Sequence, residues 1–381
     1  MKNTQILREK LDLSKIKSIG DVLCFFDKES RGSRVEKILS NPESFYLDPD
    51  MGGGQFLSEL IRDQRSRGFS DENISRRIFG FSSDVMGMNY AINKENLIGN
   101  FEVLDFISLE VRNNFLFFTI NGKHYTMNFD AILGNPPYQS PGVEIGQSQI
   151  YPSFIEKGIS ILKDGGILSY VTPPTFLKDK VSCMSGAKIT TLNTNSKKYF
   201  QNVGTSAVSY IMEKTNEERE TKIISNDSQF SVKLEYGGKL IPVGLMKEES
   251  FSIIDKIYSI DTEGRFNFKR NETPFPENAA FIRRQNRNRF FNALKTGEGF
   301  DIKVSSDYTT TERADDKISL LNSKLFSYFY LCYSTSPFIT LGFINSVPFP
   351  PEMFSTMNDS QIFEFYGITK EEIEIIEESI K

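Results

Sequence analysis

The sequence has few of the residues on which many enzymes depend for catalysis or metal binding. Its 381 residues include no tryptophan, three cysteines and a single histidine. Cys24, Cys183 and Cys332 lie far apart without C-x-x-C spacing, so they indicate neither a disulfide framework nor a zinc site and predict buried thiols. With His124 as the only histidine, neither a Ser-His-Asp triad nor a histidine-rich metal site is indicated. We therefore expect a protein that works without histidine and without a metal.

Long hydrophobic runs are also missing. No segment approaches the roughly 18 apolar residues of a membrane span, and the polar N-terminus MKNTQILREKLDLSKIKS has no signal-peptide core. We expect a cytoplasmic protein with no membrane partner. At 39% hydrophobic and 25% charged residues, the chain can build a large core and is long enough for two domains.

The net charge is −5, but basic residues are concentrated in one segment. Between Arg265 and Lys295, eight lysines or arginines face only Glu272 and Glu277, with Phe and Asn interleaved. This basic segment is either a recognition surface for a polyanion or a solvated face whose phenylalanines belong to the core. The tail GITKEEIEIIEESIK instead predicts a short acidic amphipathic helix that starts with a capping box.

Strands alternate with helices through the first 215 residues. This alternation predicts a mostly parallel sheet covered by helices on both faces. A less regular second domain follows, and we place the boundary between domains 1–220 and 221–381. The expected strands are 44–49, 76–84, 101–106, 129–133, 167–174 and 206–214, and the expected helices are 55–68 and 151–165.

Three glycines follow the first strand in DPDMGGGQF, residues 48–56. They let a ligand approach the backbone at the start of the next helix. The spacing matches neither a P-loop nor a strict G-x-G-x-x-G motif, and Asp48 would repel phosphates but attract an ammonium group. Asp84 beyond the second strand could accept ribose hydroxyls, and Asp105 beyond the third could accept an adenine amino group. Together these residues outline a pocket for a cationic nucleoside.

The stretch FDAILGNPPYQS, residues 129–140, places Asn135, Pro136, Pro137 and Tyr138 at the carboxyl end of a buried strand, where open α/β sheets bind ligands. The Asn135 side-chain oxygen and the Pro136 carbonyl can both accept hydrogen bonds from an exocyclic NH2 group. Adjacent prolines stiffen the turn, and Tyr138 offers a ring on which a flat base can stack. Two acceptors favour the tetrahedral nitrogen that attacks an electrophilic methyl group, so no general base is needed before attack.

These motifs together resemble an N6-adenine DNA methyltransferase of the gamma motif order, the restriction–modification type of the N-P-P-Y class. DPDMGGGQF is similar to the family's cofactor loop, NPPY to its catalytic motif, and YFQNVGTSAVSYIMEK to the later motif whose aromatic residue holds the flipped base. GGILSYVTPPTFL, LLNSKLFSYFYL, INSVPFPP and ITKEEIEIIEE also resemble segments of such enzymes. The resemblance implies a Rossmann-like S-adenosyl-methionine-dependent methyltransferase sheet and a smaller irregular α+β C-terminal domain that recognises the target. It also implies a bacterial, archaeal or phage protein.

The resemblance assigns roles residue by residue. Asn135, Pro136, Pro137 and Tyr138 are the expected catalytic residues. The expected S-adenosyl-methionine site comprises Asp48, Gly52, Gly54, Phe56, Asp84 and Asp105, and the expected contacts to double-stranded DNA are Phe200, Arg283, Arg284, Arg287 and Arg289. The sequence departs from the family at Ser82, where an acidic residue usually binds the ribose, and at Met51 and Gln55 in the glycine loop.

Two other functions remain open at this point. A protein glutamine methyltransferase uses the same N-P-P-Y grip on an amide, although such enzymes resemble only the catalytic domain. A catalytically silent methyltransferase-like DNA-binding protein would explain Ser82 and Met51. The expected partners are DNA and a cognate restriction endonuclease, with the protein acting as a monomer or a dimer.

Overall fold

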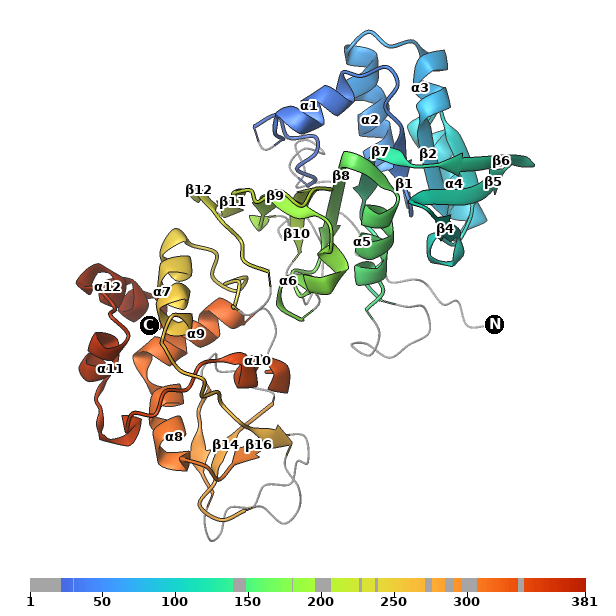
Figure 1. Cartoon of the computed structure of the whole chain (residues 1–381). Helices are drawn as coiled ribbons and strands as arrows, with labels where there is room; N and C mark the ends of the chain where they lie inside the picture. The colour runs from blue at the N-terminus through green and yellow to red at the C-terminus, as the bar shows by residue number, and fades with distance from the viewer. Residues whose placement is uncertain are drawn as a thin grey trace. The chain divides into compact units, whose positions relative to one another are not determined.

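The computed structural model describes residues 22–29, 31–139, 149–179, 181–195, 207–225, 228–236, 239–270, 276–284, 291–296, 307–334 and 339–381. The chain divides into two compact units (Figure 1). The first unit comprises residues 1–176 and 180–234, and the second comprises residues 177–179 and 235–381. Helix α6, Phe176–Asp179, spans the division.

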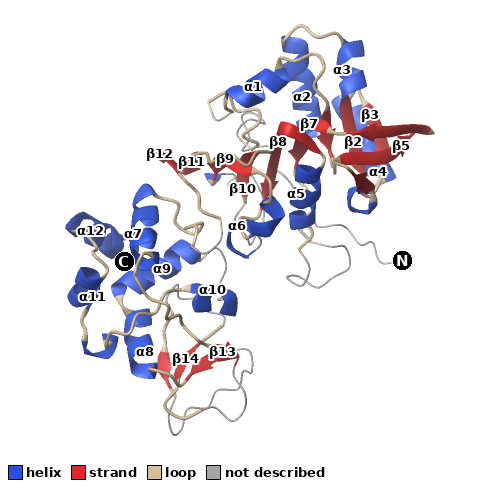
Figure 2. Ribbon diagram, in the orientation of Figure 1, coloured by secondary structure: helices blue, strands red, loops and turns tan. Residues whose placement is uncertain are grey.

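A nine-stranded sheet forms the centre of the first unit, with strand order β12-β11-β9-β10-β8-β7-β1-β2-β3 (Figure 2). The strands from β3 through β1 to β8 are parallel, whereas β10 lies antiparallel between β8 and β9. The predicted, mostly parallel α/β sheet is therefore confirmed. The strands are β1 (Tyr46–Asp48), β2 (Ile78–Ser82), β3 (Asn100–Val103), β7 (Phe129–Gly134), β8 (Leu162–Thr172), β9 (Lys188–Asn193), β10 (Val208–Glu213), β11 (Thr221–Ser225) and β12 (Ser228–Val232).

Helices cover both faces of this sheet, as expected because the side chains of its central strands are buried on both faces. On one face, Ala131 and Leu133 of β7 pack in a core with apolar residues of α1 (Ser33–Leu39), α2 (Gln55–Ser66), α3 (Asp71–Arg77) and α4 (Val85–Glu95). On the other face, α5 (Tyr151–Ser160) places Gly158 against Leu168 and Ile132. Residues 131 and 132 point to opposite faces because side chains alternate along a strand.

The prediction that the helix starting at residue 151 continues to Gly165 is wrong. Helix α5 ends at Ser160, and β8 starts at Leu162 and runs through both glycines. The reason is a pairing with distant residues: Gly165 N donates to Lys214 O at 2.9 Å, and Lys214 N donates to Gly166 O at 2.9 Å. Gly165 has φ +68°, a conformation that glycine adopts without strain.

The sequence did not predict the small antiparallel sheet of β4 (Glu110–Arg112), β5 (Phe115–Ile120) and β6 (Lys123–Met127), which follows the turn η3 (Phe106–Ser108). Phe118 of β5 packs against Phe79 and Phe81 of β2. His124 lies exposed on β6, and its Nδ1 is 2.9 Å from the Thr119 hydroxyl. The three cysteines are free and buried, as predicted.

The boundary between the two compact units differs from the boundary placed after residue 220. Strand β11 pairs in parallel with β9, and β12 pairs with β11. These strands therefore extend the first unit to Leu234. Strand β12 is polar and largely exposed, and the five residues of β11 are too few for a clear periodic signal from which the pairing could be predicted.

The second unit combines helices with a four-stranded sheet of order β13-β16-β14-β15 (Figure 2). Helix α9 is its centre, with eight of its ten residues buried. The strands are β13 (Lys269–Arg270), β14 (Ala280–Ile282), β15 (Leu294–Lys295) and β16 (Tyr308–Thr310), and the helices are α7 (Glu248–Tyr258), α8 (Ala314–Asn322), α9 (Lys324–Tyr333), α10 (Leu341–Ser346), α11 (Asp359–Phe365) and α12 (Lys370–Ser379). Short 3-10 turns are η4 (Val181–Met184) in the first unit and η6 (Phe354–Thr356) in the second.

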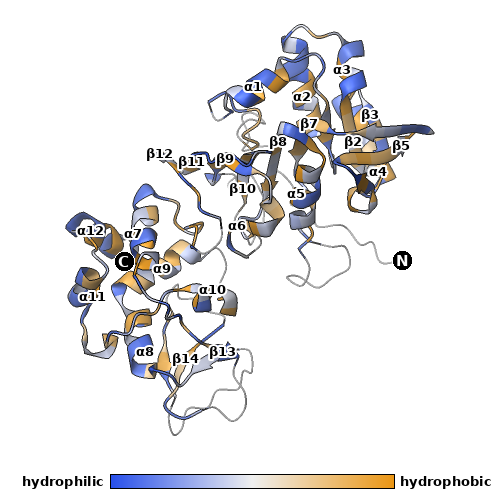
Figure 3. Cartoon of the chain, viewed as in Figure 1, coloured by the Kyte–Doolittle hydropathy of each residue, from blue (hydrophilic) through white to orange (hydrophobic). Residues whose placement is uncertain are grey.

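The predicted acidic tail helix is confirmed as α12. The Thr369 hydroxyl and the Glu372 carboxylate form the predicted capping box. Helices α7 and α12 carry both hydrophobic and hydrophilic residues (Figure 3), as helices with one buried face do. Glu372 itself is buried rather than solvated, and its carboxylate accepts from Ser252 Oγ at 2.8 Å and pairs with Lys256 Nζ at 2.5 Å.

Candidate active site at the carboxyl ends of the strands

The N-P-P-Y motif directly follows β7, which lies between β1 and β8 in the sheet. Gly134, the residue before the motif, lies against Asp48 at the end of β1. A Cβ atom on Gly134 would lie 2.8 Å from Asp48 Oδ1, so any larger residue would displace that carboxylate. Asp48 and Asn135, predicted from motifs that are 87 residues apart, are thus brought together at one edge of the sheet.

Asn135 is half-buried, and its Oδ1 atom is fully buried with no hydrogen-bond partner in the described part of the chain. Leaving such an acceptor unpaired costs about 1–3 kcal/mol. The site therefore holds an acceptor that a ligand N–H group can satisfy. Pro136 is buried beneath it, and Pro137 is half-buried.

Tyr138 is held in place from three sides. Its hydroxyl donates to Val171 O on β8 at 3.3 Å, and its carbonyl accepts from Ile150 N at 3.3 Å. The Tyr151 ring lies edge-on to the Tyr138 ring, with centroids 6.2 Å apart. These contacts fix the tyrosine beside Asn135 without covering it completely, since Tyr138 remains half-exposed.

The glycine loop joins β1 to α2 and carries Asp48 at its start. Asp48 is 1% exposed, and its Oδ1 accepts from Asp50 N at 3.1 Å. Gly52 and Gly54 have φ of +53° and +75°, so both occupy the left-handed region that favours glycine. Gly54 is the N-cap of α2.

Met51 of the loop and Phe56 of α2 lie in the core. Phe56 and Met51 are 6% and 3% exposed and belong to the cluster between the helices and the sheet. Met51 N donates to Phe81 O of β2 at 2.9 Å, which anchors the loop. The unusual Met51 is therefore part of the packing beneath the loop.

Asp84 and Asp105 follow the adjacent strands β2 and β3, as predicted, and both are exposed. Each caps the element that follows it. Asp84 accepts from the backbone amides of Met86 and Gly87 at 3.0 and 3.1 Å, and Asp105 Oδ1 accepts from Ile107 N at 3.1 Å. N-capping explains part of why these two residues are aspartates.

No sequence pattern indicated two residues that lie near Asp105 and Asp48. Lys157 of α5 donates from Nζ to Ile107 O at 2.8 Å and to Leu109 O, across the turn that Asp105 caps. Tyr170 of β8 lies directly opposite Gly134 and is fully buried. Burial raises the pKa of Tyr170, and the Asp48 carboxylate raises it further. No local pattern marks either residue, because their contacts are with residues 36 or more positions away.

The predicted DNA-contacting residues are only partly described. Arg283 and Arg284 are exposed and directly follow β14 in the second unit. Two hydrogen bonds fix the backbone of Arg284. Its N donates to Asp307 Oδ1 at 2.9 Å, and its O accepts from Ile339 N at 2.8 Å. Phe200, Arg287 and Arg289 lie outside the described residues. The phenylalanines of the basic segment that are described, Phe266, Phe268, Phe281 and Phe291, are all buried.

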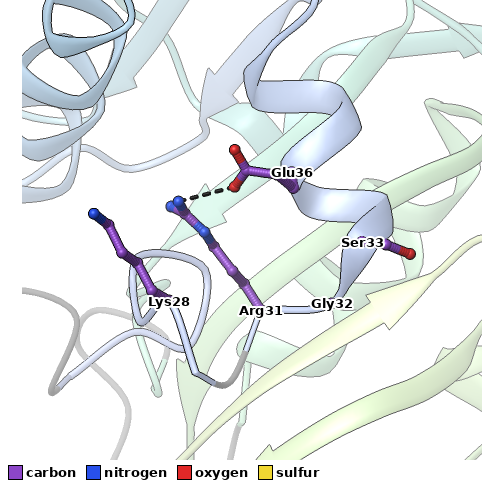
Figure 4. Close-up of a pocket in the computed structure, with 5 residues that line it drawn as sticks. All are labelled: Lys28, Arg31, Gly32, Ser33 and Glu36. Atoms are coloured by element: carbon purple, nitrogen blue, oxygen red, sulfur yellow. Dashed lines mark ion pairs between the residues drawn. The ribbon is translucent and has the colours of Figure 1, made fainter.

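A separate hollow lies at the start of α1, lined by Lys28, Arg31, Gly32, Ser33 and Glu36. Figure 4 shows the ion pair between Arg31 and Glu36 that borders it, with a distance of 2.9 Å. None of these residues is among the predicted site residues. No group of three or more His, Cys, Asp or Glu side chains in the described ranges is arranged to hold a metal ion. No helix within those ranges is long and apolar enough to cross a membrane.

Part of the chain resembles a known protein family. Residues 72–199 match the Eco57I restriction-modification methylase family. The matched residues include Asp84, Asp105 and the N-P-P-Y motif, whereas the glycine loop precedes them. The predicted resemblance to a restriction–modification methyltransferase is confirmed by this match. The gamma order of motifs and the adenine specificity stay predictions. No curated protein matches the chain.

Solved structures of restriction–modification proteins resemble the chain at low identity. The M protein of the type I restriction enzyme EcoKI is 16% identical, with a TM-score of 0.40 over 49% of this chain and 45% of that chain. The type I methyltransferase subunit of Streptococcus thermophilus is 18% identical, with a TM-score of 0.35 over 54% of this chain and 50% of that one. The type IIL enzyme MmeI, solved in complex with DNA, is 12% identical, with a TM-score of 0.47 over 95% of this chain and 73% of MmeI. The match thus spans only about half of the two type I subunits.

Proposed function

We propose that this protein is a site-specific DNA methyltransferase that transfers a methyl group from S-adenosyl-methionine to the N6 amino group of a flipped adenine. The observation that carries the proposal is the buried Asn135 Oδ1 atom, which has no hydrogen-bond partner among the described residues and lies beside the fixed Tyr138 ring. An acceptor in this state suits a substrate that brings an N–H group, and the ring suits a flat base. The Eco57I family match supports a methyltransferase of this type.

The target nitrogen would be gripped by two acceptors. Asn135 Oδ1 and the Pro136 carbonyl would each take one N–H of the exocyclic amino group, which turns the lone pair outward. Tyr138 would stack on the adenine after it swings out of the duplex, since a base inside the stack is out of reach. Because the grip itself exposes the lone pair, no general base acts before attack. After attack the surplus proton leaves the nitrogen for solvent.

The cofactor would lie at the carboxyl ends of β1, β2 and β3. Bound S-adenosyl-methionine supplies an electrophilic methyl group on a positively charged sulfur. Asp48 would attract the cofactor's ammonium group, and the glycine loop at Gly52 and Gly54 would let the ligand approach the backbone. Asp84 would accept the ribose hydroxyls and Asp105 the adenine amino group, with Phe56 supporting the loop from the core.

The second unit would recognise double-stranded DNA. Arg283 and Arg284 offer exposed guanidinium groups at the end of β14. Arg287 and Arg289 follow them in the sequence and would also contact DNA. Guanidinium groups neutralise phosphates and read guanine edges. Phe200 would pack against the flipped base. In this proposal, the first unit catalyses and the second unit selects the target.

The test is transfer of labelled methyl groups to double-stranded DNA, followed by analysis of the modified nucleosides. The wild type should produce N6-methyladenine. Asn135→Ala should lower the turnover at least 100-fold, an order of magnitude taken from the loss of transition-state hydrogen bonds, while its affinity for S-adenosyl-methionine stays within a few-fold. Asn100→Ala is the matched control, because Asn100 is also half-buried in this sheet but donates internally to Ser75 O and Ile78 O.

Three outcomes would contradict the proposal. Near-normal turnover of Asn135→Ala would remove the assigned grip. Label on protein glutamine and none on DNA would favour a glutamine methyltransferase. DNA binding without any affinity for S-adenosyl-methionine would point to a catalytically silent recognition protein.

A further inference from the structure

Helix α5 contacts both halves of the proposed site. At its start, Tyr151 lies edge-on to the Tyr138 ring of the N-P-P-Y motif. Six residues later, and about 9 Å along the helix axis, Lys157 reaches the turn that follows β3. The Phe154 ring, between these two positions, packs on Phe106 of the same turn, with centroids 5.3 Å apart.

Lys157 holds this turn through its backbone. Its ammonium group donates to the carbonyls of Ile107 and Leu109 and lies 5.3 Å from the centroid of the Phe106 ring. Asp105 begins the turn, and its Oδ1 accepts from Ile107 N. The same peptide segment is therefore held by Asp105 on its amide side and by Lys157 on its carbonyl side.

The charge on Lys157 also faces Asp105. Burial lowers the pKa of Lys157, and the Asp105 carboxylate offsets part of this shift. Asp105 itself is exposed, so its direction depends on the bond that its Oδ1 accepts from Ile107 N in the turn and not on packing. A carboxylate on an exposed turn loses conformational freedom when it binds a ligand, unless the turn is already rigid.

We propose that Lys157 is a positioning residue that fixes the Asp105 turn against α5 and thereby sets the affinity for S-adenosyl-methionine. The inference rests on the proposed function, because it takes Asp105 as the partner of the cofactor's adenine. Lys157 acts through the turn and does not touch the substrate. Its loss should therefore raise the dissociation constant of the cofactor and leave the turnover at saturating cofactor almost unchanged.

The structure offers a matched control in Lys214. This lysine is also half-buried and donates to two backbone carbonyls, Leu162 O at 2.7 Å and Ser160 O at 3.4 Å. Burial lowers its pKa as well, and the Asp164 carboxylate offsets part of the shift. Lys214 thus matches Lys157 in chemistry, but the carbonyls that it binds belong to the connection between α5 and β8 and not to the Asp105 turn.

The experiment is calorimetric titration of the full-length chain with S-adenosyl-methionine, together with thermal unfolding and steady-state kinetics. Lys157→Met should raise the dissociation constant by about tenfold, the typical effect of losing a charge-assisted hydrogen bond, with turnover at saturating cofactor within about twofold. Lys157→Arg should restore most of the affinity. Lys214→Met should lower the unfolding temperature about as much as Lys157→Met does, but it should leave the dissociation constant of the cofactor unchanged.

A double-mutant cycle tests whether Lys157 acts through Asp105. Asp105→Ala alone should weaken cofactor binding, and adding Lys157→Met should then have no further effect. Three results would overturn this inference and leave the proposed function intact. The wild type and Lys157→Met could have equal dissociation constants, or the two substitutions could have additive effects in the cycle. Lys157→Met and Lys214→Met could also lose the same affinity for the cofactor. A wild type that does not bind S-adenosyl-methionine would instead overturn the proposed function, and the inference with it.

Discussion

Gly54 tests whether the glycine loop depends on its backbone conformation. The residue has φ +75° and begins α2. In an alanine variant the left-handed conformation costs about 1–2 kcal/mol. The new Cβ would also lie 2.7 Å from Leu97 Cδ1 and 3.4 Å from Ala91 Cβ. Leu97 is 7% exposed and packed in the core, so its side chain cannot simply turn away.

Overpacking of this kind adds about 1–3 kcal/mol, and the lower entropy of the unfolded alanine chain returns about 0.4–1 kcal/mol. Gly54→Ala should therefore destabilise the first unit by roughly 2–4 kcal/mol. For a unit of this size the midpoint of thermal unfolding should fall by roughly 4–16 °C. Differential scanning calorimetry on the full-length chain would measure the shift.

Gly53→Ala is the control from the same loop. Gly53 does not have a left-handed φ, and the nearest atoms to its added Cβ are at the end of the flexible Gln55 side chain. Its effect should stay below about 1 kcal/mol. If both variants unfold at the same temperature, the left-handed conformation of Gly54 and its contact with Leu97 do not determine the stability of the loop.

Three further predictions concern single side chains. Asp84→Ala should destabilise α4 by about 1 kcal/mol even without cofactor. Asp84→Asn should keep the cap and lose only ribose binding. Chemical denaturation measures the effect on stability, and calorimetric titration measures the effect on cofactor binding. Burial raises the pKa of Glu372, but its hydrogen bonds outweigh this effect and hold the pKa below the usual value. The contribution of ionised Glu372 to the stability of the fold is therefore complete above its pKa in the unfolded chain, and it is lost as the pH falls through its pKa in the folded protein. Glu372→Gln should flatten the loss of stability on acidification below about pH 4.5, and an unchanged acid profile would contradict this. Arg283→Ala and Arg284→Ala should each lower the slope of log K against log salt for DNA by about one if they meet phosphates. Lys370→Ala, at an exposed position of α12, should leave the slope unchanged.

The sequence was most informative where the determinants of structure are local. The strand before N-P-P-Y is a short apolar run that ends in turn residues, and β7 has almost those bounds. The capping box of Thr369 and Glu372 involves two residues three positions apart, and α12 begins there. In both cases the residues that decide the structure lie within one turn or one strand.

Predictions failed where distant residues decide the structure. Gly165 resembles a helix terminus in sequence, yet its hydrogen bonds with Lys214 place it in a strand. The β5–β6 hairpin is local, with Asn121 and Gly122 in left-handed conformations at its turn, but the packing of Phe118 against Phe79 is a contact that no periodic pattern reveals. Lys157 is an ordinary helix lysine in sequence, and the role proposed for it follows only from its hydrogen bonds to Ile107 and Leu109.

The structure also separates two carboxylates that the sequence treated alike. Both oxygens of Asp84 accept from backbone amides of α4, whereas a single oxygen of Asp105 is bound to the amide of its turn. Capping fixes both side chains, but it leaves Asp105 with more acceptor capacity for a ligand. Asp84 must share each oxygen between the helix and a ribose, and Ser82, at the neighbouring position, contributes no charge. We therefore expect the adenine end of the cofactor to contribute more binding energy than the ribose. The lysine that stabilises the Asp105 turn lies at this end of the site.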